Sequence, residues 1–152
     1  MRITDYLTGD LVATGLAPDT KEEACAQLVD LLVASGIVAT ERRDPLYEKI
    51  IEREKLSSTG MGGGVAIPHT FGEDLAQAVI VFAQIPDGVE FESLDGAPVK
   101  LIFLIVGSER APKAHLQILA MIVRLLKNRE LVDRLTSARS PEEAYQLLAS
   151  VE

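Results

Sequence analysis

The chain has 152 residues, of which 47% are hydrophobic and 25% charged, and this is the size and composition of one compact domain with a buried core. Its formal net charge of -8 argues against a general nucleic-acid surface, because such a surface gathers basic residues on one face to replace phosphate counterions. No apolar run approaches the roughly 20 residues that span a bilayer and the first residues lack a secretory pattern, so we expect a single domain, 1–152, in the cytoplasm and without membrane insertion.

The first predicted helix covers residues 20–35. Thr20 and Glu23 have the spacing of a capping box, apolar residues recur on one face, and Gly36 can end the helix. Cys25 lies in this pattern and is predicted to be a small buried hydrophobe. A single cysteine cannot form an internal disulfide, which agrees with a reducing compartment.

The second predicted helix covers residues 46–56, with Leu46 and Ile50 facing inward. Arg53 lies near its end, immediately before a run of three hydroxyl residues at 57–59. The plain interpretation of Arg53 is a solvated salt bridge with a neighbouring glutamate, and the hydroxyl residues can simply end the helix.

The pattern then changes to strands. Residues 78–85 and 100–107 are continuous apolar runs rich in branched side chains, as expected for strands covered on both faces. The connection between them is rich in turn residues and too short for a helical crossover. Together with the surrounding helices, these strands predict an α/β fold, a three-layer α/β/α arrangement with a mixed β-sheet.

Three helices are predicted after Gly107. The first is expected to bury Leu116, Leu119, Ile122, Val123 and Leu126, and a short helix follows around 129–136. The last covers 141–149, where Ser140 is the N-cap, Pro141 lies in the first turn and Glu143 completes a capping box.

The stretch TGMGGGVAIPHT, residues 59–70, does not match the common glycine-rich motifs. A P-loop needs a lysine after its last glycine, and no lysine occurs from 56 to 99. A dinucleotide fingerprint needs a third glycine where Val65 stands. Two histidines 46 residues apart make a poor zinc site, so no metal is expected.

What remains is a loop that becomes a short strand, 65–67, whose end delivers His69. An imidazole there can be a nucleophile toward phosphorus, because one nitrogen attacks while the other is held by a hydrogen bond. Nearby glycines let the backbone approach the transferred group, hydroxyls can donate to its oxygens, and Arg53 can supply a cation. The residues assigned to phosphoryl binding are Ser58, Thr59, Gly62 and Gly64. From the residues alone, a structural histidine at a strand end is an equal alternative for His69, and it is the favoured one for His115.

These residues resemble the enzyme IIA domain of the bacterial phosphoenolpyruvate-dependent phosphotransferase system, of the fructose/mannitol and nitrogen-regulatory type. Three stretches carry the resemblance in family order over almost the entire chain: EREKLSSTGMGGGVAIPH, FESLDGAPVKLIFLIVG and the histidine of AHLQIL. The family's motif positions are met at Arg53, Glu54, Ser58, Thr59, Gly62, Gly64, Ala66, Pro68 and His69.

The resemblance implies that His69 accepts a phosphoryl group from the histidine of a small HPr-like phosphocarrier protein. The resemblance likewise implies that His115 donates a hydrogen bond to the phosphoryl oxygens and that Arg53 is the cation of the site. It also implies a mixed sheet between helices, with neither a metal nor an organic cofactor. In sugar-transporting members the group then passes to a IIB domain, whereas nitrogen-type members act on a regulatory target protein. Because no transport segment is attached here, we expect the regulator, with the fructose/mannitol-type transport component as the alternative.

The chain departs from the resemblance next to the motif histidine. Many members have a glycine directly after the motif histidine, whereas here Thr70 and Phe71 lie between His69 and Gly72. We expect the phosphocarrier to dock on an apolar patch around this loop, with Phe71 as a contact. The alternative is that the ring of Phe71 turns inward as part of the core.

Overall fold

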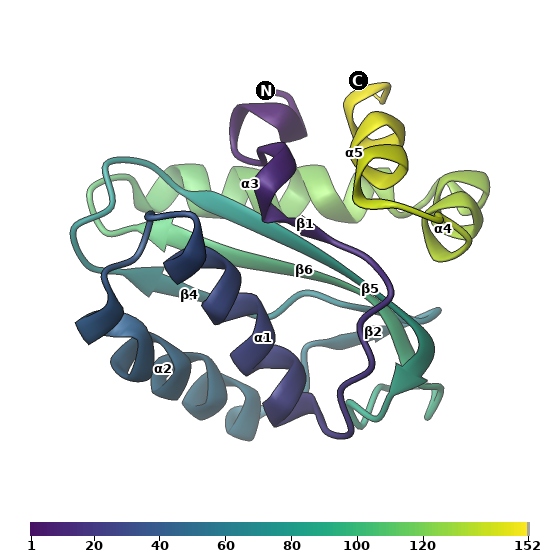
Figure 1. Ribbon diagram of the computed structural model, residues 1–152, viewed down its shortest axis with the longest axis horizontal. Coiled ribbons are helices and arrows are strands. Elements are labelled where there is room, and N and C mark those ends of the chain that lie inside the picture. The colour runs from purple at the N-terminus through teal and green to yellow at the C-terminus, as the bar shows by residue number, and fades with distance from the viewer. Residues whose placement is uncertain (152) are drawn as a thin grey trace.

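The computed structural model describes residues 1–151 and is shown in Figure 1. Three short 3-10 turns, η1 to η3, accompany the helices and strands. The elements in chain order are η1 (Ile3–Asp5), η2 (Gly9–Leu11), β1 (Val12–Ala13), α1 (Lys21–Ala34), η3 (Thr40–Arg42), α2 (Arg43–Leu56), β2 (Gly60–Gly62), β3 (Val65–Ala66), β4 (His69–Gly72), β5 (Val79–Val89), β6 (Val99–Ser108), α3 (Pro112–Leu125), α4 (Arg129–Thr136) and α5 (Pro141–Ala149). Among these residues, no helix has the length and apolar character needed to cross a membrane.

The six strands form one mixed sheet in the order β1-β5-β6-β3-β2, and β4 also pairs with β6. β5 and β6 are antiparallel, as their short connection predicts, whereas β3 and β4 both run parallel to β6. In Figure 1, α1 and α2 lie on one side of the sheet and α3, α4 and α5 on the other. The predicted three-layer α/β/α fold is therefore confirmed.

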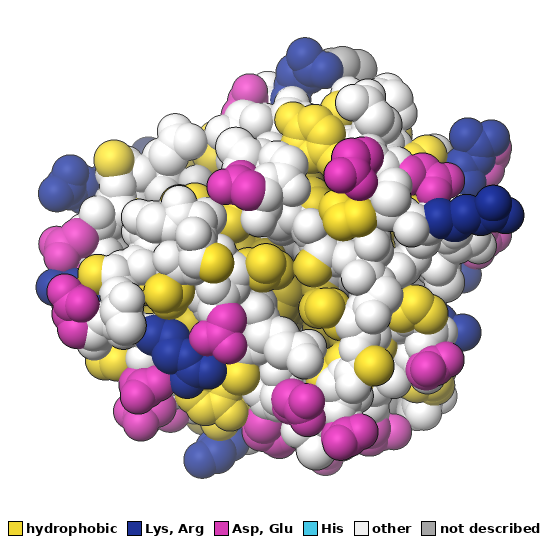
Figure 2. All heavy atoms as spheres, viewed as in Figure 1, with side chains coloured by type: hydrophobic (Ala, Val, Ile, Leu, Met, Phe, Trp, Pro, Cys, Tyr) yellow, Lys and Arg dark blue, Asp and Glu magenta, His cyan; other side chains and the backbone are white. Residues whose placement is uncertain are grey.

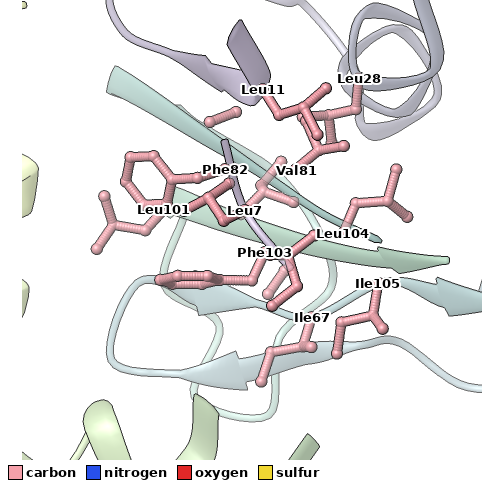
Figure 3. Close-up of a cluster of buried hydrophobic side chains, with 14 of the residues drawn as sticks. Leu7, Leu11, Leu28, Ile67, Val81, Phe82, Leu101, Phe103, Leu104 and Ile105 are labelled. Atoms are coloured by element: carbon pink, nitrogen blue, oxygen red, sulfur yellow. The ribbon is translucent and has the colours of Figure 1, made fainter. Parts of the chain in front are cut away.

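The core is built on the long antiparallel pair, β5 and β6. Phe82 lies opposite Phe103 in the ladder, and their rings meet edge to face with centroids 5.0 Å apart. Because successive strand residues point to opposite faces, Val81 lies on the other side of the sheet. Figure 3 shows Val81 gathered there with Leu11 and Leu28, on the side of α1.

The local signals at helix ends are confirmed. The Thr20 side chain accepts a hydrogen bond from the Glu23 amide, and Ser140 does the same for Glu143. Cys25 is buried as predicted, and burial raises the pKa of its thiol to about 12. This thiol is therefore a packing group rather than a nucleophile.

The predicted inner face of α3 is partly wrong. Leu116 is 68% exposed and Val123 is 38% exposed, whereas Ile122 is buried as expected. The other side chains that α3 buries are His115, Ile118 and Met121. Apolar residues surround most of this helix, so its sequence periodicity does not distinguish the covered face from the open one.

Candidate functional site

His69 begins β4, directly after Pro68. The pairing of β3 and β4 with β6 continues in one register through this segment, with Ala66 opposite Ile102 and His69 opposite Ile105. The Ile105 amide donates to the Pro68 carbonyl at 3.0 Å. The His69 ring is half-buried, and its Nδ1 lies 2.9 Å from the Ile67 carbonyl oxygen. Because a carbonyl only accepts hydrogen bonds, Nδ1 carries the proton and the lone pair of the neutral ring lies on Nε2.

His115 belongs to a different element and lies in the first turns of α3. Its ring centroid lies 5.5 Å from that of His69. The side chain is buried, and this burial, followed by the proximity of His69, lowers the pKa of His115 below its usual value. The fold therefore brings the only two histidines of the chain together, although 45 residues separate them in the sequence.

The His115 ring is enclosed by Phe71 and Gly107, which lie opposite each other in the β4–β6 ladder. The Phe71 ring is tilted by 32° against His115, with centroids 4.5 Å apart. A β-carbon on Gly107 would stand 2.5 Å from Nδ1 of His115, so only glycine leaves room for the ring. The half-buried Phe71 ring is thus turned onto His115.

Arg53 lies in the last turn of α2. Its Nη1 donates to the carbonyl of Ser57, the C-cap residue of the same helix, at 3.0 Å. Two residues later, the Thr59 carbonyl accepts a hydrogen bond from the Ile67 amide, in the segment that leads to His69. The guanidinium is therefore held at the turn between α2 and the hairpin.

Glu54 was not among the predicted site residues. Its buried carboxylate accepts hydrogen bonds from both the amide and the hydroxyl of Thr59. These bonds hold the turn from α2 into the hairpin, next to the helix end that carries Arg53. The only sequence signal was that Glu54 directly follows Arg53 in the motif.

The two predicted hydroxyl ligands already have partners. The Thr59 hydroxyl donates to Glu54, whereas the Ser58 hydroxyl donates to the Phe91 carbonyl and accepts from the Gly60 amide. Both residues lie at the open end of the hairpin, on the side of His69. In this arrangement they build the framework of the site, and their hydroxyl protons are engaged elsewhere.

Gly62 and Gly64 lie at the closed end of the same hairpin. Both have left-handed backbone angles, with φ of 86° and 83°, which favour glycine. Val65 pairs with Leu101 and His69 with Ile105, so about 13 Å of strand separates this turn from the histidine. The structure therefore does not bring Gly62 and Gly64 to the two histidines.

A cavity lies beside β4 but does not include the histidines. It has a volume of about 290 Å³, lies on the α2 side of the strand and includes Lys49 and Phe71 in its lining. No histidine side chain is visible on the face shown in Figure 2. Within residues 1–151, no group of three potential metal ligands occurs.

Comparison with known proteins identifies the family of the chain that contains this histidine pair. Residues 5–151 match the model of the EIIA 2 family of the phosphoenolpyruvate-dependent sugar phosphotransferase system. The chain belongs to this family. The earlier resemblance is thereby confirmed, and the protein is a IIA phosphocarrier of the phosphotransferase system.

Relatives of this IIA protein include both regulatory and sugar-specific members. A nitrogen regulatory protein of Pseudomonas aeruginosa is 37% identical and covers 100% of this chain and 97% of its own. A fructose-specific EIIA component of Haloferax volcanii is 33% identical, with 99% of each chain covered. The crystal structure of nitrogen regulatory protein IIA-Ntr from Neisseria meningitidis has a TM-score of 0.86 and 29% identity, covering 96% of this chain and 98% of that one.

Proposed function

We propose that this protein carries a phosphoryl group on Nε2 of His69, which it accepts from the phosphohistidine of an HPr-like phosphocarrier. One observation carries the proposal: the Nδ1 of His69 is held by the Ile67 carbonyl, which leaves the lone pair on Nε2 of a half-buried ring. The second histidine beside it adds a group that can donate to a phosphoryl oxygen.

The transfer needs no cofactor. The Nε2 lone pair of His69 forms a bond to phosphorus, the bond from phosphorus to the donor imidazole breaks, and its electron pair returns to the donor nitrogen. The proton stays on Nδ1 and is donated to the Ile67 carbonyl, and this hydrogen bond stabilises the positive charge that develops on the His69 ring. Such a reaction asks mainly for positioning and for charge stabilisation, which a few polar groups can supply.

We assign the stabilisation to His115 and Arg53. His115 donates from the far side of the site, and Arg53 supplies the cation after turning from the Ser57 carbonyl. Ser58 and Thr59 contribute indirectly, because their hydroxyls hold the hairpin. Gly62 and Gly64 form its turn, which shapes the hairpin rather than touching the phosphoryl group.

The regulatory type is the favoured role within the family. The nitrogen regulatory relative is more similar in sequence than the fructose-specific one, and the IIA-Ntr structure superposes closely over nearly the full chain. The partner downstream of His69 is then a regulatory target protein in the cytoplasm. The alternative is a fructose/mannitol-type uptake component that passes the group to a IIB domain, and the full-length fructose-specific relative supports it.

The decisive experiment is phosphorylation by phosphoenolpyruvate, enzyme I and the phosphocarrier, followed by intact-mass measurement. Wild-type protein is expected to gain one phosphoryl group, acid-labile and attached to Nε2. His69→Ala is expected to gain none. His115→Ala is the matched control, because it removes the other imidazole of the same site and is expected to label slowly but completely. Normal labelling of His69→Ala would refute the assignment.

The same assay tests Arg53. A charged hydrogen bond to a phosphoryl group contributes about 1.5–3 kcal/mol, so Arg53→Ala is expected to label roughly 10 to 100-fold more slowly. Its unfolding transition is expected to stay close to that of the wild type, because the lost contact is a single half-exposed one. Labelling at the wild-type rate would remove Arg53 from the site.

A further inference from the structure

The two nitrogens of His115 lie in different surroundings. Nδ1 is buried and has no hydrogen-bond partner. It lies against the backbone of Gly107, whose missing β-carbon provides the space, and Phe71 stacks on the ring. A phosphoryl group on the neighbouring His69 can therefore be met only by Nε2.

This enclosure also selects one neutral form of the ring. An N–H at Nδ1 would be a buried donor without an acceptor and would face a Cα hydrogen of Gly107, whereas a lone pair on Nδ1 can accept a weak contact from that C–H group. The neutral ring therefore carries its proton on Nε2. The imidazolium would place a second N–H at the enclosed Nδ1, so it is disfavoured for the same reason.

We propose that Phe71 and Gly107 are positioning residues that hold His115 as a neutral donor, with its proton on Nε2 directed at the phosphoryl site. This inference rests on the proposed function, because it assigns a role to His115 in phosphoryl transfer. The hydrogen bond from a neutral His115 is charge-assisted only through the phosphoryl oxygens, because the ring adds no positive charge of its own. A neutral His115 thus holds the phosphoryl group without preventing its departure to the next protein.

Nitrogen-15 NMR of the unphosphorylated protein tests the tautomer directly. At about pH 8, above the ordinary histidine pKa of roughly 6.5, wild-type His115 is expected to show the signals of one tautomer, protonated on Nε2. Phe71→Ala admits water to Nδ1, and Gly107→Ala displaces the ring through its added methyl group. Both variants are expected to show mixed tautomers and roughly 10 to 100-fold slower phosphorylation.

Leu75→Ala is the matched control. Leu75 is half-buried in the loop after β4 and packs against the core, with its side chain beside Gly72, so its truncation also removes apolar packing near the site. It is expected to retain the single wild-type tautomer. Should Phe71→Ala not fold, Phe71→Leu keeps apolar volume but cannot stack, and it is expected to show mixed tautomers as well. Phe71→Tyr restores the ring and is expected to restore the tautomer.

Two results would overturn the inference. The first is wild-type His115 protonated on Nδ1 or present as a mixture, and the second is an unchanged single tautomer in both Gly107→Ala and the Phe71 variant. Neither result depends on phosphorylation. The failure of this inference is therefore distinguishable from the failure of His69 as acceptor, which the labelling of His69→Ala decides.

Discussion

His69 and His115 have neighbouring rings but unequal environments, and this difference supports the proposed roles of acceptor and donor. His69 is half-buried, so its Nε2 can meet an atom of another protein, and its Nδ1 is held by a carbonyl. His115 is only 5% exposed, so it cannot reach the phosphohistidine of a partner. Acceptor and donor are therefore distinguished by burial as well as by hydrogen bonding.

The lowered pKa of His115 predicts a pH dependence of stability. Between its lowered folded pKa and the ordinary value of about 6.5, the unfolded chain binds more protons at this residue than the folded chain does. The free energy of unfolding therefore rises with pH across this window and gains nothing from His115 above it. Besides burial, the neighbouring imidazole of His69 lowers the pKa of His115.

Chemical denaturation at several pH values from about 5 to 8 measures this effect. His115→Gln has no titrating ring, so its stability is expected to rise less steeply with pH than that of the wild type below about pH 6.5. Above that pH the difference between the two proteins is expected to be constant. Parallel profiles throughout would show that His115 is not shifted.

The turn between α2 and the hairpin connects the helix end that carries Arg53 to the strands that lead to His69. Glu54 on the last turn of α2 receives two donors from Thr59, and Lys21 of α1 lies 3.5 Å from the same carboxylate. The buried carboxylate is thus surrounded by donors, as a buried charge requires. Three elements meet at this one side chain.

Glu54→Gln is predicted to weaken this turn. The glutamine side chain keeps one acceptor oxygen, but its NH2 group replaces the other oxygen and faces hydrogen-bond donors. One buried donor therefore loses its acceptor, which lowers the free energy of unfolding by about 1–3 kcal/mol. Phosphorylation of His69 is expected to slow as well, because the end of α2 that carries Arg53 loosens. Denaturation and labelling measure the two effects. Glu52→Gln, an exposed position on the same helix, is expected to change stability by less than about 0.5 kcal/mol. Equal effects of both substitutions would contradict a special role of Glu54.

Elements that are specified by residues close together in the sequence were predictable, whereas contacts between distant segments across the sheet were not. The caps at Thr20 and Ser140 follow from residues three positions apart, so the sequence specifies them directly. β4 was not predicted, because residues 69–72 form a strand only by pairing with β6, which lies far along the chain. The stacking of Phe71 on His115 depends on this pairing, so it was beyond sequence reasoning, although the resemblance had identified both histidines.

The molecule carries a negative net charge, and a few apolar side chains are exposed on its surface. The formal net charge is -8, and Figure 2 shows acidic groups along the lower margin of one face. Leu116 is the neighbour of His115 in α3 and is 68% exposed, whereas Phe71, the contact expected from the sequence, is half-buried against His115. Leu116 is therefore the stronger candidate for contact with a phosphocarrier.

Leu116→Ala is predicted to weaken productive docking of the phosphocarrier by roughly 5 to 30-fold, as expected when a central apolar contact of about 1–2 kcal/mol is lost. Its melting temperature is expected to stay unchanged, because the side chain is mostly exposed in the free protein. Leu94→Ala is the matched control: Leu94 is 94% exposed, but its neighbour Asp95 binds the Gly63 amide at the closed end of the hairpin, away from His69. The dependence of the phosphorylation rate on carrier concentration measures both variants. An equal loss in both would assign the effect to surface hydrophobicity in general, and no loss in Leu116→Ala would exclude the outer face of α3 from the docking surface.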